Sequence, residues 1–407
     1  MKIRKLFPFL LSLILIISAC QPAATGELSP AQETAIAGTV TAVFNELERT
    51  PSPTPTPIPT EEPSEPTSTQ VPTNTATAVP VVIGPNDYPE NVNPLTGLEV
   101  EDPTLLNRRP VIMKVSNHQI NYRPHWGLSS ADMVFEYYIG WGANRFAALF
   151  YGQDSDRIGP VRSIRRVDGQ LGSLYEAVVG STGGNQEQVL PYLENYISGR
   201  YFTDKYLCPG VCDDGRNMVY SVFGNSAALS DFYKQRNVSL DDPELYGMVF
   251  SETVPQGGTK GESAWVHWSY ADYSRWVYNA ESGKYTLWSM GESTGDVFKP
   301  LIDQNTSEAL EFANVIYLQT RYAEHDPTWH TIDLIGNFDG EKAVVFRDGL
   351  AYEVVWKTPA NDKPIQYFDA EGKAFPLKPG NTWVVILGLS SPIEVEDGDW
   401  SISFSLP

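Results

Sequence analysis

The sequence predicts an α+β protein with a mixed α/β first domain and a mainly antiparallel β second domain, built as a sandwich or an open barrel. About 315 residues follow a low-complexity N-terminal segment, which is too many for one ordinary core and suits two domains. Between residues 91 and 253 strand-like runs are mixed with helix-like ones. From residue 254 to 407 helical periodicity nearly vanishes, and aromatic and β-branched runs alternate with glycine-containing turns.

Residues 1–19 have the composition of a bacterial lipoprotein signal peptide. A positive segment at residues 2–5 precedes an apolar run at residues 6–17 that is too short to span a bilayer. The small residues Ser18-Ala19 stand directly before Cys20, as in a lipobox. We therefore expect Cys20 to carry acyl chains that hold the protein on the extracytoplasmic side of the cell membrane.

Residues 20–90 form the predicted connection between the lipid and the fold. An amphipathic pattern at residues 29–49 predicts one short helix, which begins with the capping signal Ser29-Pro30. Residues 50–80 are dense in Pro and Thr and favour extended polyproline II. At about 3.1 Å per residue this stalk reaches roughly 90 Å from the membrane.

The charge of the chain limits its partners. The formal net charge is −21, and loss of Lys2, Arg4 and Lys5 with the signal peptide takes it to −24. Nucleic acid is excluded as a partner because its binding needs a net basic surface. The lipid is then the expected membrane anchor, because an anionic membrane repels such a surface.

The first domain, residues 91–253, is expected to contain strands and helices in alternation. Its two predicted helices, at residues 185–196 and 225–236, each begin with an Asn cap. It also holds 11 Arg and 3 Lys, whereas residues 254–407 hold 3 Arg and 8 Lys. Arginine suits planar carboxylate or phosphate groups, so a polar site is expected in the first domain. The predicted strands are 110–117, 132–139, 145–152 and 176–182.

An arginine-rich stretch and a glycine turn are the main candidates for a binding site. Gly159-Pro160 breaks the chain, and a helix start is expected near Arg162 and Arg165, with Ser163 as a cap. Arg145 is expected to join them, and helix starts attract anions. The turn contributes Ser181, Gly183, Gly184 and Asn185. Alternatively, the arginines pair with internal carboxylates, for which the candidates are Asp132, Glu136, Asp154, Asp156 and Asp168.

Two further groups of residues carry alternative chemistry. Cys208 and Cys212 lie in a Pro/Gly loop and are expected to form a local disulfide in an oxidising compartment, rather than to bind a metal. His118, Asp132 and Glu136 are the candidate catalytic residues of a hydrolase, because paired carboxylates perform acid–base chemistry. Asn117, Arg123 and His125 are expected beside His118, where they would line a cleft.

Several motifs resemble the YerB-like bacterial lipoprotein family over roughly residues 91–390. The most specific are Asn93-Pro-Leu-Thr-Gly97 and Gly159-Pro-Val-Arg-Ser163, with "VFRDGLAYEVVWK" and "KPGNTWVVI" in the second domain. The resemblance implies a two-domain extracytoplasmic lipoprotein of unassigned activity and brings no catalytic residues. Two histidines of the family pattern are absent, at the turns 181–185 and 215–220, which weakens imidazole chemistry.

The sequence leads to three hypotheses about function. In the first, a surface-anchored binding or structural module holds an anionic envelope ligand against Arg145, Arg162, Arg165 and the turn 181–185. In the second, the protein is a cell-envelope hydrolase acting on glycan or peptide. In the third, it is a scaffold that contacts other envelope proteins through an aromatic-rich sheet. A non-enzymatic role is favoured, no cofactor or metal is expected, and the oligomeric state stays open.

Overall fold

A computed structural model describes residues 81–117, 123–216, 220–236, 243–269, 272–290, 298–327 and 329–406. The predicted lipidation site Cys20, the helix at residues 29–49, the stalk and His118 lie outside these residues. Among the described residues, no helix combines the length and the apolar composition that a membrane crossing requires.

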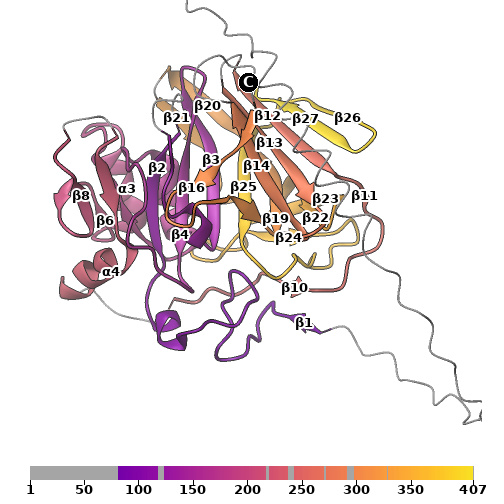
Figure 1. Ribbon diagram of the computed structural model, residues 1–407, viewed down its shortest axis with the longest axis horizontal. Coiled ribbons are helices and arrows are strands. Elements are labelled where there is room, and N and C mark those ends of the chain that lie inside the picture. Colours follow the sequence, from indigo (N-terminus) through magenta and orange to yellow (C-terminus); the bar gives the residue numbers. More distant parts are fainter. Residues whose placement is uncertain are drawn as a thin grey trace, which may run out of the picture. The chain divides into compact units, whose positions relative to one another are not determined.

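One large mixed sheet carries strands from both halves of the chain (Figure 1). Parallel pairing of β25 with β3 joins the halves, with Thr382 opposite Met133 and Ile386 opposite Tyr137. In spatial order the sheet contains β11 (Thr259–Lys260), β23 (Leu350–Lys357), β22 (Glu341–Arg347), β19 (Asn314–Thr320), β25 (Thr382–Gly388), β3 (Met133–Gly140), β4 (Ala143–Phe150), β2 (Val111–Ser116), β5 (Val178–Gly180) and β6 (Tyr201–Phe202), with β24 (Gln366–Phe368) beside β23.

A second, smaller sheet is built entirely from strands of the second half of the chain. Its pairs are antiparallel except for the parallel pair β12–β27. Its strands are β15 (Phe298–Pro300), β14 (Lys284–Met290), β13 (Asp272–Asn279), β12 (Ser263–Ser269), β27 (Asp399–Ser403) and β26 (Ile393–Glu396), with β18 (Glu311–Phe312) beside β14.

Short strands and three α-helices complete the described part of the chain. The helices are α2 (Arg166–Leu174), α3 (Leu190–Ile197) and α4 (Ser226–Gln235), and short 3-10 turns occur at Pro103–Asn107 and Leu128–Ser130. The small sheets are β1 (Val82–Ile83) with β10 (Phe250–Ser251), β7 (Tyr206–Leu207) with β8 (Val211–Asp213) and β9 (Val222–Gly224), β16 (Ile302–Asp303) with β17 (Glu308–Ala309), and β20 (Tyr322–Asp326) with β21 (Trp329–Ile332).

Side-chain alternation along the large sheet creates two cores. Phe135 faces the core on the side of α2 and α3, whereas its neighbour Val134 faces the core that contains α4 and the smaller sheet. Trp268 and Trp276 of the smaller sheet pack into this second core. The second half is therefore a sandwich of two sheets, which confirms the α+β prediction with a β-rich second domain.

The predicted elements of the first half are largely present, with shifted helix starts. The four predicted strands correspond to β2, β3, β4 and β5, and Asn225 caps α4 by accepting a hydrogen bond from the amide of Ala228. The prediction that a helix begins at Asn185 is wrong, because α3 begins at Leu190. Both halves contribute strands to one sheet, and the domain boundary at residue 253 stays a prediction.

Candidate functional site

The arginine stretch runs from Arg157 to Arg166, and its residues up to Arg165 lead from β4 into α2 without forming a helix. The amide of Ser116 donates to the Pro160 carbonyl, and the amide of Arg162 donates to the Lys114 carbonyl. The expected helix start near Arg162 is wrong, because these hydrogen bonds hold the segment against β2. The helix begins at Arg166, where the Asp168 carboxylate, rather than Ser163, accepts from the Arg165 amide at 2.6 Å.

The glycine turn lies directly against this segment. The Ile164 amide donates to the Gly183 carbonyl at 2.9 Å, and the Thr182 amide donates to the Arg162 carbonyl at 3.3 Å. The structure thus brings together two motifs that the sequence separates by about twenty residues. Within the described part of the chain, the amides of Gly183 and Gly184 have no hydrogen-bond partner.

Other residues of the turn have internal roles. Ser181 is buried, and its hydroxyl faces the carbonyls of Gly183 and Phe202. Gly184 packs so closely on Ile164 that an added Cβ would lie 2.8 Å from the Ile164 Cγ2 atom. The exposed Asn185 accepts hydrogen bonds from the amides of Glu187 and Gln188 and so shapes the turn before α3.

Four cationic side chains gather around the junction of these segments: Lys114, Arg145, Arg162 and Arg165, which we call the arginine cluster. Lys114 is fully buried on β2, with its Nζ 3.6 Å from Asp168 Oδ1 and 3.9 Å from the centre of the Tyr137 ring. Arg145 on β4 is 7% exposed. Its Nη1 donates to the Ser163 carbonyl at 2.9 Å, and Arg165 Nη1 approaches the same oxygen at 3.4 Å.

Burial and mutual repulsion alter the acidity of these groups. Burial lowers the pKa of Lys114 to about 7, and the nearby charge of Asp168 opposes this shift. Burial also lowers the pKa of Arg145 to about 9, and the charges of Arg165 and Arg162 lower it further. The pKa of Arg165 is lowered chiefly by burial. The cluster therefore holds like charges close together in a poorly hydrated place.

The carboxylates expected to neutralise the arginines have other partners. Asp168 accepts from the Tyr137 hydroxyl and pairs with Lys114. Asp154 pairs with Arg108 at 2.9 Å, and Asp156 accepts from Asn225. Among the residues that the structure describes, Arg145 and Arg165 have no ion pair, and their Nε atoms are buried without a hydrogen-bond partner. Ion pairs with internal carboxylates therefore do not neutralise the positive charges of these two guanidinium groups.

A cavity of about 210 Å³ adjoins the cluster at Arg165 and reaches the second half of the chain. Arg166 Nε donates to the Gln188 carbonyl at 2.8 Å, and its guanidinium lies 4.8 Å from the Trp329 ring centre. His330 from β21 is almost buried, and its Nε2 lies 3.0 Å from Glu324 Oε2. The cavity is lined by Arg165, Arg166, Asn185, Gln188, Val189, Trp329 and His330.

The two candidate catalytic carboxylates, Asp132 and Glu136, each accept three hydrogen bonds from their own set of donors. Asp132 accepts from the amides of Tyr151 and Gly152 and from the Asn93 side chain. Burial raises the pKa of Asp132 to about 6. Its side chain anchors the 93–97 motif and lines a cavity of about 570 Å³.

Glu136 lies deeper, between the two sheets. Its carboxylate accepts from the indole nitrogens of Trp268 and Trp383, each at 2.8 Å, and from Asn144 at 2.7 Å. Burial raises the pKa of Glu136 to about 7. Glu136 does not line the Asp132 cavity, so the two carboxylates do not share that space.

The expected cleft around residues 117–125 is not formed by the described side chains there. Asn117 is buried and donates to Asn144 at 2.7 Å, and Arg123 donates to Ser289 at 2.7 Å. His125 is fully buried with Nε2 2.8 Å from the Ser116 carbonyl, and burial lowers its pKa to about 4. These residues link β2, β4 and β14 in the interior.

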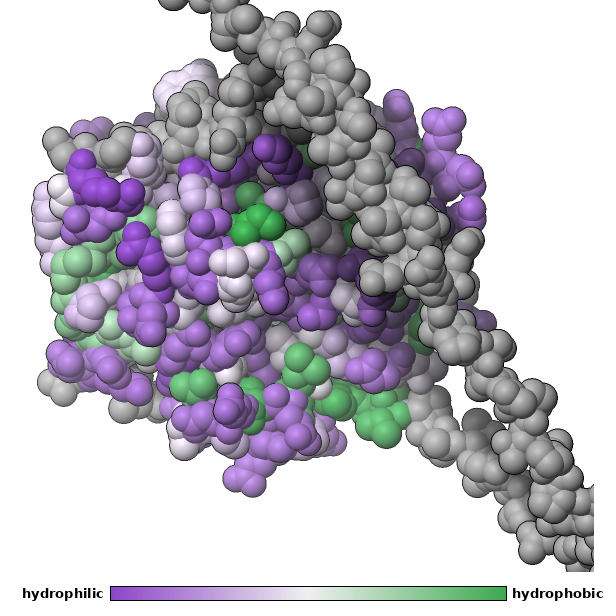
Figure 2. Space-filling model, viewed as in Figure 1, coloured by the Kyte–Doolittle hydropathy of each residue, from purple (hydrophilic) through white to green (hydrophobic). Residues whose placement is uncertain are grey.

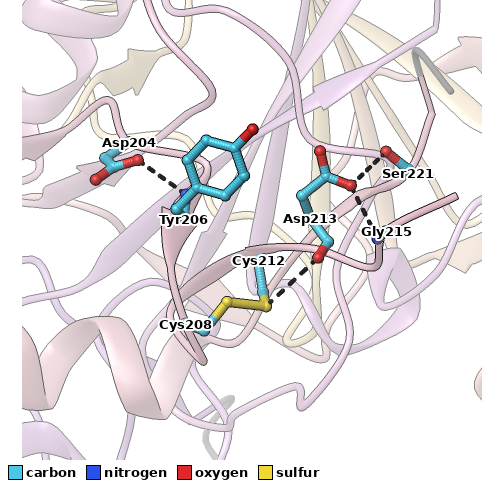
Figure 3. The surroundings of a disulfide bond; sticks show 7 residues. All are labelled: Asp204, Tyr206, Cys208, Cys212, Asp213, Gly215 and Ser221. Atoms are coloured by element: carbon cyan, nitrogen blue, oxygen red, sulfur yellow. Dashed lines mark hydrogen bonds between the residues drawn. A yellow bond between two sulfur atoms is a disulfide. The ribbon is translucent and has the colours of Figure 1, made fainter. Parts of the chain in front are cut away.

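Cys208 and Cys212 form the predicted disulfide across the β7–β8 turn (Figure 3). The adjacent Asp213 accepts from the Ser221 hydroxyl at 2.8 Å and from the Gly215 amide at 3.1 Å. It also pairs with Lys205 at 2.8 Å. Within the described ranges, no group of three or more His, Cys, Asp or Glu side chains is placed to hold a metal ion.

Sequence reasoning missed several residues of this region. Lys114 interrupts an apolar strand, and a charge within such a run was a usable signal of a buried polar cluster. Arg166 lies at the end of the arginine stretch but is not among the predicted site residues. Nothing in the sequence around Trp329 and His330 predicts that they lie near the arginine stretch, because only the fold brings β21 next to α2.

Comparisons with known proteins agree with this architecture. Residues 95–239 match the "Protein of unknown function (DUF3048) N-terminal domain", and residues 264–384 match the corresponding C-terminal domain. "Putative lipoprotein YerB" of Bacillus subtilis (strain 168) is 27% identical over 307 residues, which cover 72% of this chain and 85% of that protein.

The crystal structure of the YerB protein from Bacillus subtilis has the same fold. It matches with a TM-score of 0.59 and 22% identity, covering 73% of this chain and 96% of the other. The two domain models match this chain in the expected order, and the similarity to YerB extends across both halves. These findings confirm the resemblance inferred from the 93–97 and 159–163 motifs. The chain belongs to the two-domain YerB-like family.

Proposed function

We propose that this protein is a lipid-anchored extracytoplasmic binding protein whose arginine cluster receives an anionic envelope ligand. The proposed anchor is supported by the lipobox-like residues that end at Cys20 and by the similarity to the Bacillus subtilis protein named "Putative lipoprotein YerB". The Pro/Thr-rich residues 50–80 then act as a spacer between the membrane and the binding domain.

The observation that carries the proposal is an excess of buried positive charge. Lys114 pairs with Asp168, whereas Arg145 and Arg165, which lie close to the same carboxylate, lack an ion pair among the described residues. An uncompensated buried charge is expensive, and a bound anion would compensate it. The local charge of the arginine cluster is positive, whereas the net charge of the whole chain is −21.

The chemistry of the region favours a carboxylate or phosphate group. A guanidinium presents a planar fork that matches either group, and the amides of Gly183 and Gly184 lie on the adjacent turn. The adjoining cavity of about 210 Å³ is small for a drug-sized ligand. We therefore expect it to take the anionic end of a larger envelope molecule.

Calorimetric titration of the full-length protein in detergent with inorganic phosphate, and separately with citrate, tests the proposal. Binding of at least one anion is expected, and Arg165→Gln should weaken it about tenfold or more, because a charge-assisted contact is lost. Arg109→Gln is the matched control, since Arg109 already pairs with Glu176 at 2.8 Å. Equal affinity in the wild type and Arg165→Gln, or no binding of either anion, would contradict the proposal.

The alternative function, an envelope hydrolase acting on glycan or peptide, has weaker support. Asp132 and Glu136 each accept three hydrogen bonds, and they have separate sets of partners. Such carboxylates suit structural anchoring better than proton transfer to a substrate.

A further inference from the structure

The outward face of the smaller sheet has an unusual composition for a solvated surface. Along β12, Ala264, Val266 and Trp268 point into the core, while Trp265 and His267 point outward and are half-buried. The outward side of such a sheet is normally polar. Here four neighbouring rings occupy it, and we call them the aromatic face: Trp265, His267, Tyr273 and Phe298.

The four rings contact one another in a single aromatic cluster. Trp265 and His267 are nearly parallel, with ring centres 5.8 Å apart and an interplanar angle of 13°. His267 and Tyr273 are 5.7 Å apart at 25°. Phe298 packs against both Trp265 and Tyr273, at 4.9 and 5.2 Å. Because these side chains come from three strands of one sheet, their positions are fixed by backbone pairing rather than by a loop.

A cavity of about 480 Å³ separates the aromatic face from an acidic edge. Strand pairing places Ser401 opposite both Trp265 and Glu394, and it places Asp399 opposite Glu396. The β26–β27 hairpin lies at the upper right of Figure 1, and the same place is hydrophilic in Figure 2. The cavity is lined by Trp265, His267, Glu394, Val395, Glu396, Asp399 and Ser401.

The charges around this cavity leave a negative excess. Asp399 pairs with Arg275 at 2.9 Å, and the Arg275 guanidinium lies 4.7 Å from the Trp265 ring centre. The carboxylates of Glu394 and Glu396 have no hydrogen bond or ion pair within the described residues. Burial lowers the pKa of His267, so its ring is neutral at neutral pH and does not oppose a cation.

We propose that the aromatic face and its acidic edge form a second binding site, which takes a saccharide that carries free amino groups. The apolar C–H face of a pyranose ring stacks on flat aromatic side chains, which are rigid and lose little entropy on binding. The ammonium groups meet Glu394 and Glu396, and sugar hydroxyls meet Ser401 and His267. This site lies in the second half and is separate from the arginine cluster.

The geometry distinguishes this ligand from a basic peptide. Trp265 and His267 present two nearly parallel rings that line the cavity, and a sugar ring would pack against them there. A basic peptide would use the acidic edge and would make cation–π contacts with the rings, but it has no pyranose face to stack on them. Direct binding measurements with each ligand class therefore distinguish the two.

Binding measurements on the full-length protein in detergent test this proposal. The probes are a β-1,4-linked glucosamine tetrasaccharide, its fully N-acetylated counterpart and poly-L-lysine. The amine-bearing tetrasaccharide should bind most tightly, and Trp265→Ala should weaken it about tenfold or more, as expected for an aromatic anchor. Glu394→Gln combined with Glu396→Gln should remove the preference over the acetylated form.

Two controls make the result specific. Trp141→Ala removes a tryptophan that is 73% exposed on the β3–β4 turn and should leave saccharide binding unchanged. Arg165→Gln should also leave it unchanged, which keeps this site distinguishable from the proposed anion site. The proposal is overturned if neither saccharide binds at millimolar concentration, if Trp141→Ala weakens binding as much as Trp265→Ala, or if poly-L-lysine alone binds.

Discussion

The arginine cluster and the aromatic face handle charge in opposite ways. In the first, Lys114, Arg145 and Asp168 are removed from water, and the two cations are held by the strands that carry them and by backbone carbonyls. In the second, Glu394 and Glu396 stand in solvent at the edge of a sheet whose aromatic rings are half-buried. The comparison teaches that equal changes in charge should have very different effects on folding in the two places.

Removal of the central carboxylate of the arginine cluster should have the largest effect. Asp168→Asn leaves the buried Lys114 without its ion-pair partner and weakens the cap of α2. We expect the free energy of unfolding to fall by about 3–5 kcal/mol in chemical denaturation. The matched change Asp399→Asn breaks the more exposed pair with Arg275 and should cost less than about 1 kcal/mol. Equal losses in the two variants would contradict the distinction between the regions.

The pH dependence of stability should sharpen the same contrast. The pKa of Lys114 is about 7 in the folded protein, against an ordinary value of 10.5. Between these values the unfolded chain binds a proton that the folded chain has released, so stability should rise with pH. We expect the free energy of unfolding of the wild type, relative to Lys114→Met, to increase as the pH is raised from 7 to 10.5. Parallel curves for the two proteins would show that Lys114 keeps an ordinary pKa.

Neutralisation of the acidic edge should have the smallest effect on folding. Glu394→Gln combined with Glu396→Gln removes two exposed carboxylates that have no partners among the described residues. The free energy of unfolding should change by less than about 0.5 kcal/mol, measured by the same denaturation experiment. A larger loss would mean that these carboxylates stabilise the fold and are not available to a ligand.

The strands of the first half were predicted well because the apolar pattern that identifies a strand lies within the strand itself. The runs at 110–117 and 132–139 correspond to β2 and β3, and their apolar residues mark both faces as buried. The sharing of one sheet by both halves was not predictable, because β3 pairs with β25 about 250 residues away. Likewise, the sequence made Glu136 a candidate catalytic acid, because it does not show that the indoles of Trp268 and Trp383 donate hydrogen bonds to this carboxylate.

The candidate site was also predictable only in part, because local composition reveals some of its residues and long-range packing supplies the others. Arg145, Arg162, Arg165 and the turn at residues 181–185 attracted notice through composition, and the structure places them in contact. Lys114 and the contribution of β21 required long-range packing to be seen. Composition thus pointed to a group of residues that the fold brings together, and only the fold shows that Arg145 and Arg165 have no ion pair among the described residues.

A crystal structure of the protein soaked in tungstate, a heavy analogue of phosphate, tests the central claim most directly. The account predicts anomalous density for a tungstate ion within hydrogen-bond distance of the Arg145 or Arg165 guanidinium, beside the Gly183–Gly184 turn. A carboxylate of the protein's own chain on these guanidinium groups, with no tungstate bound there, would contradict it.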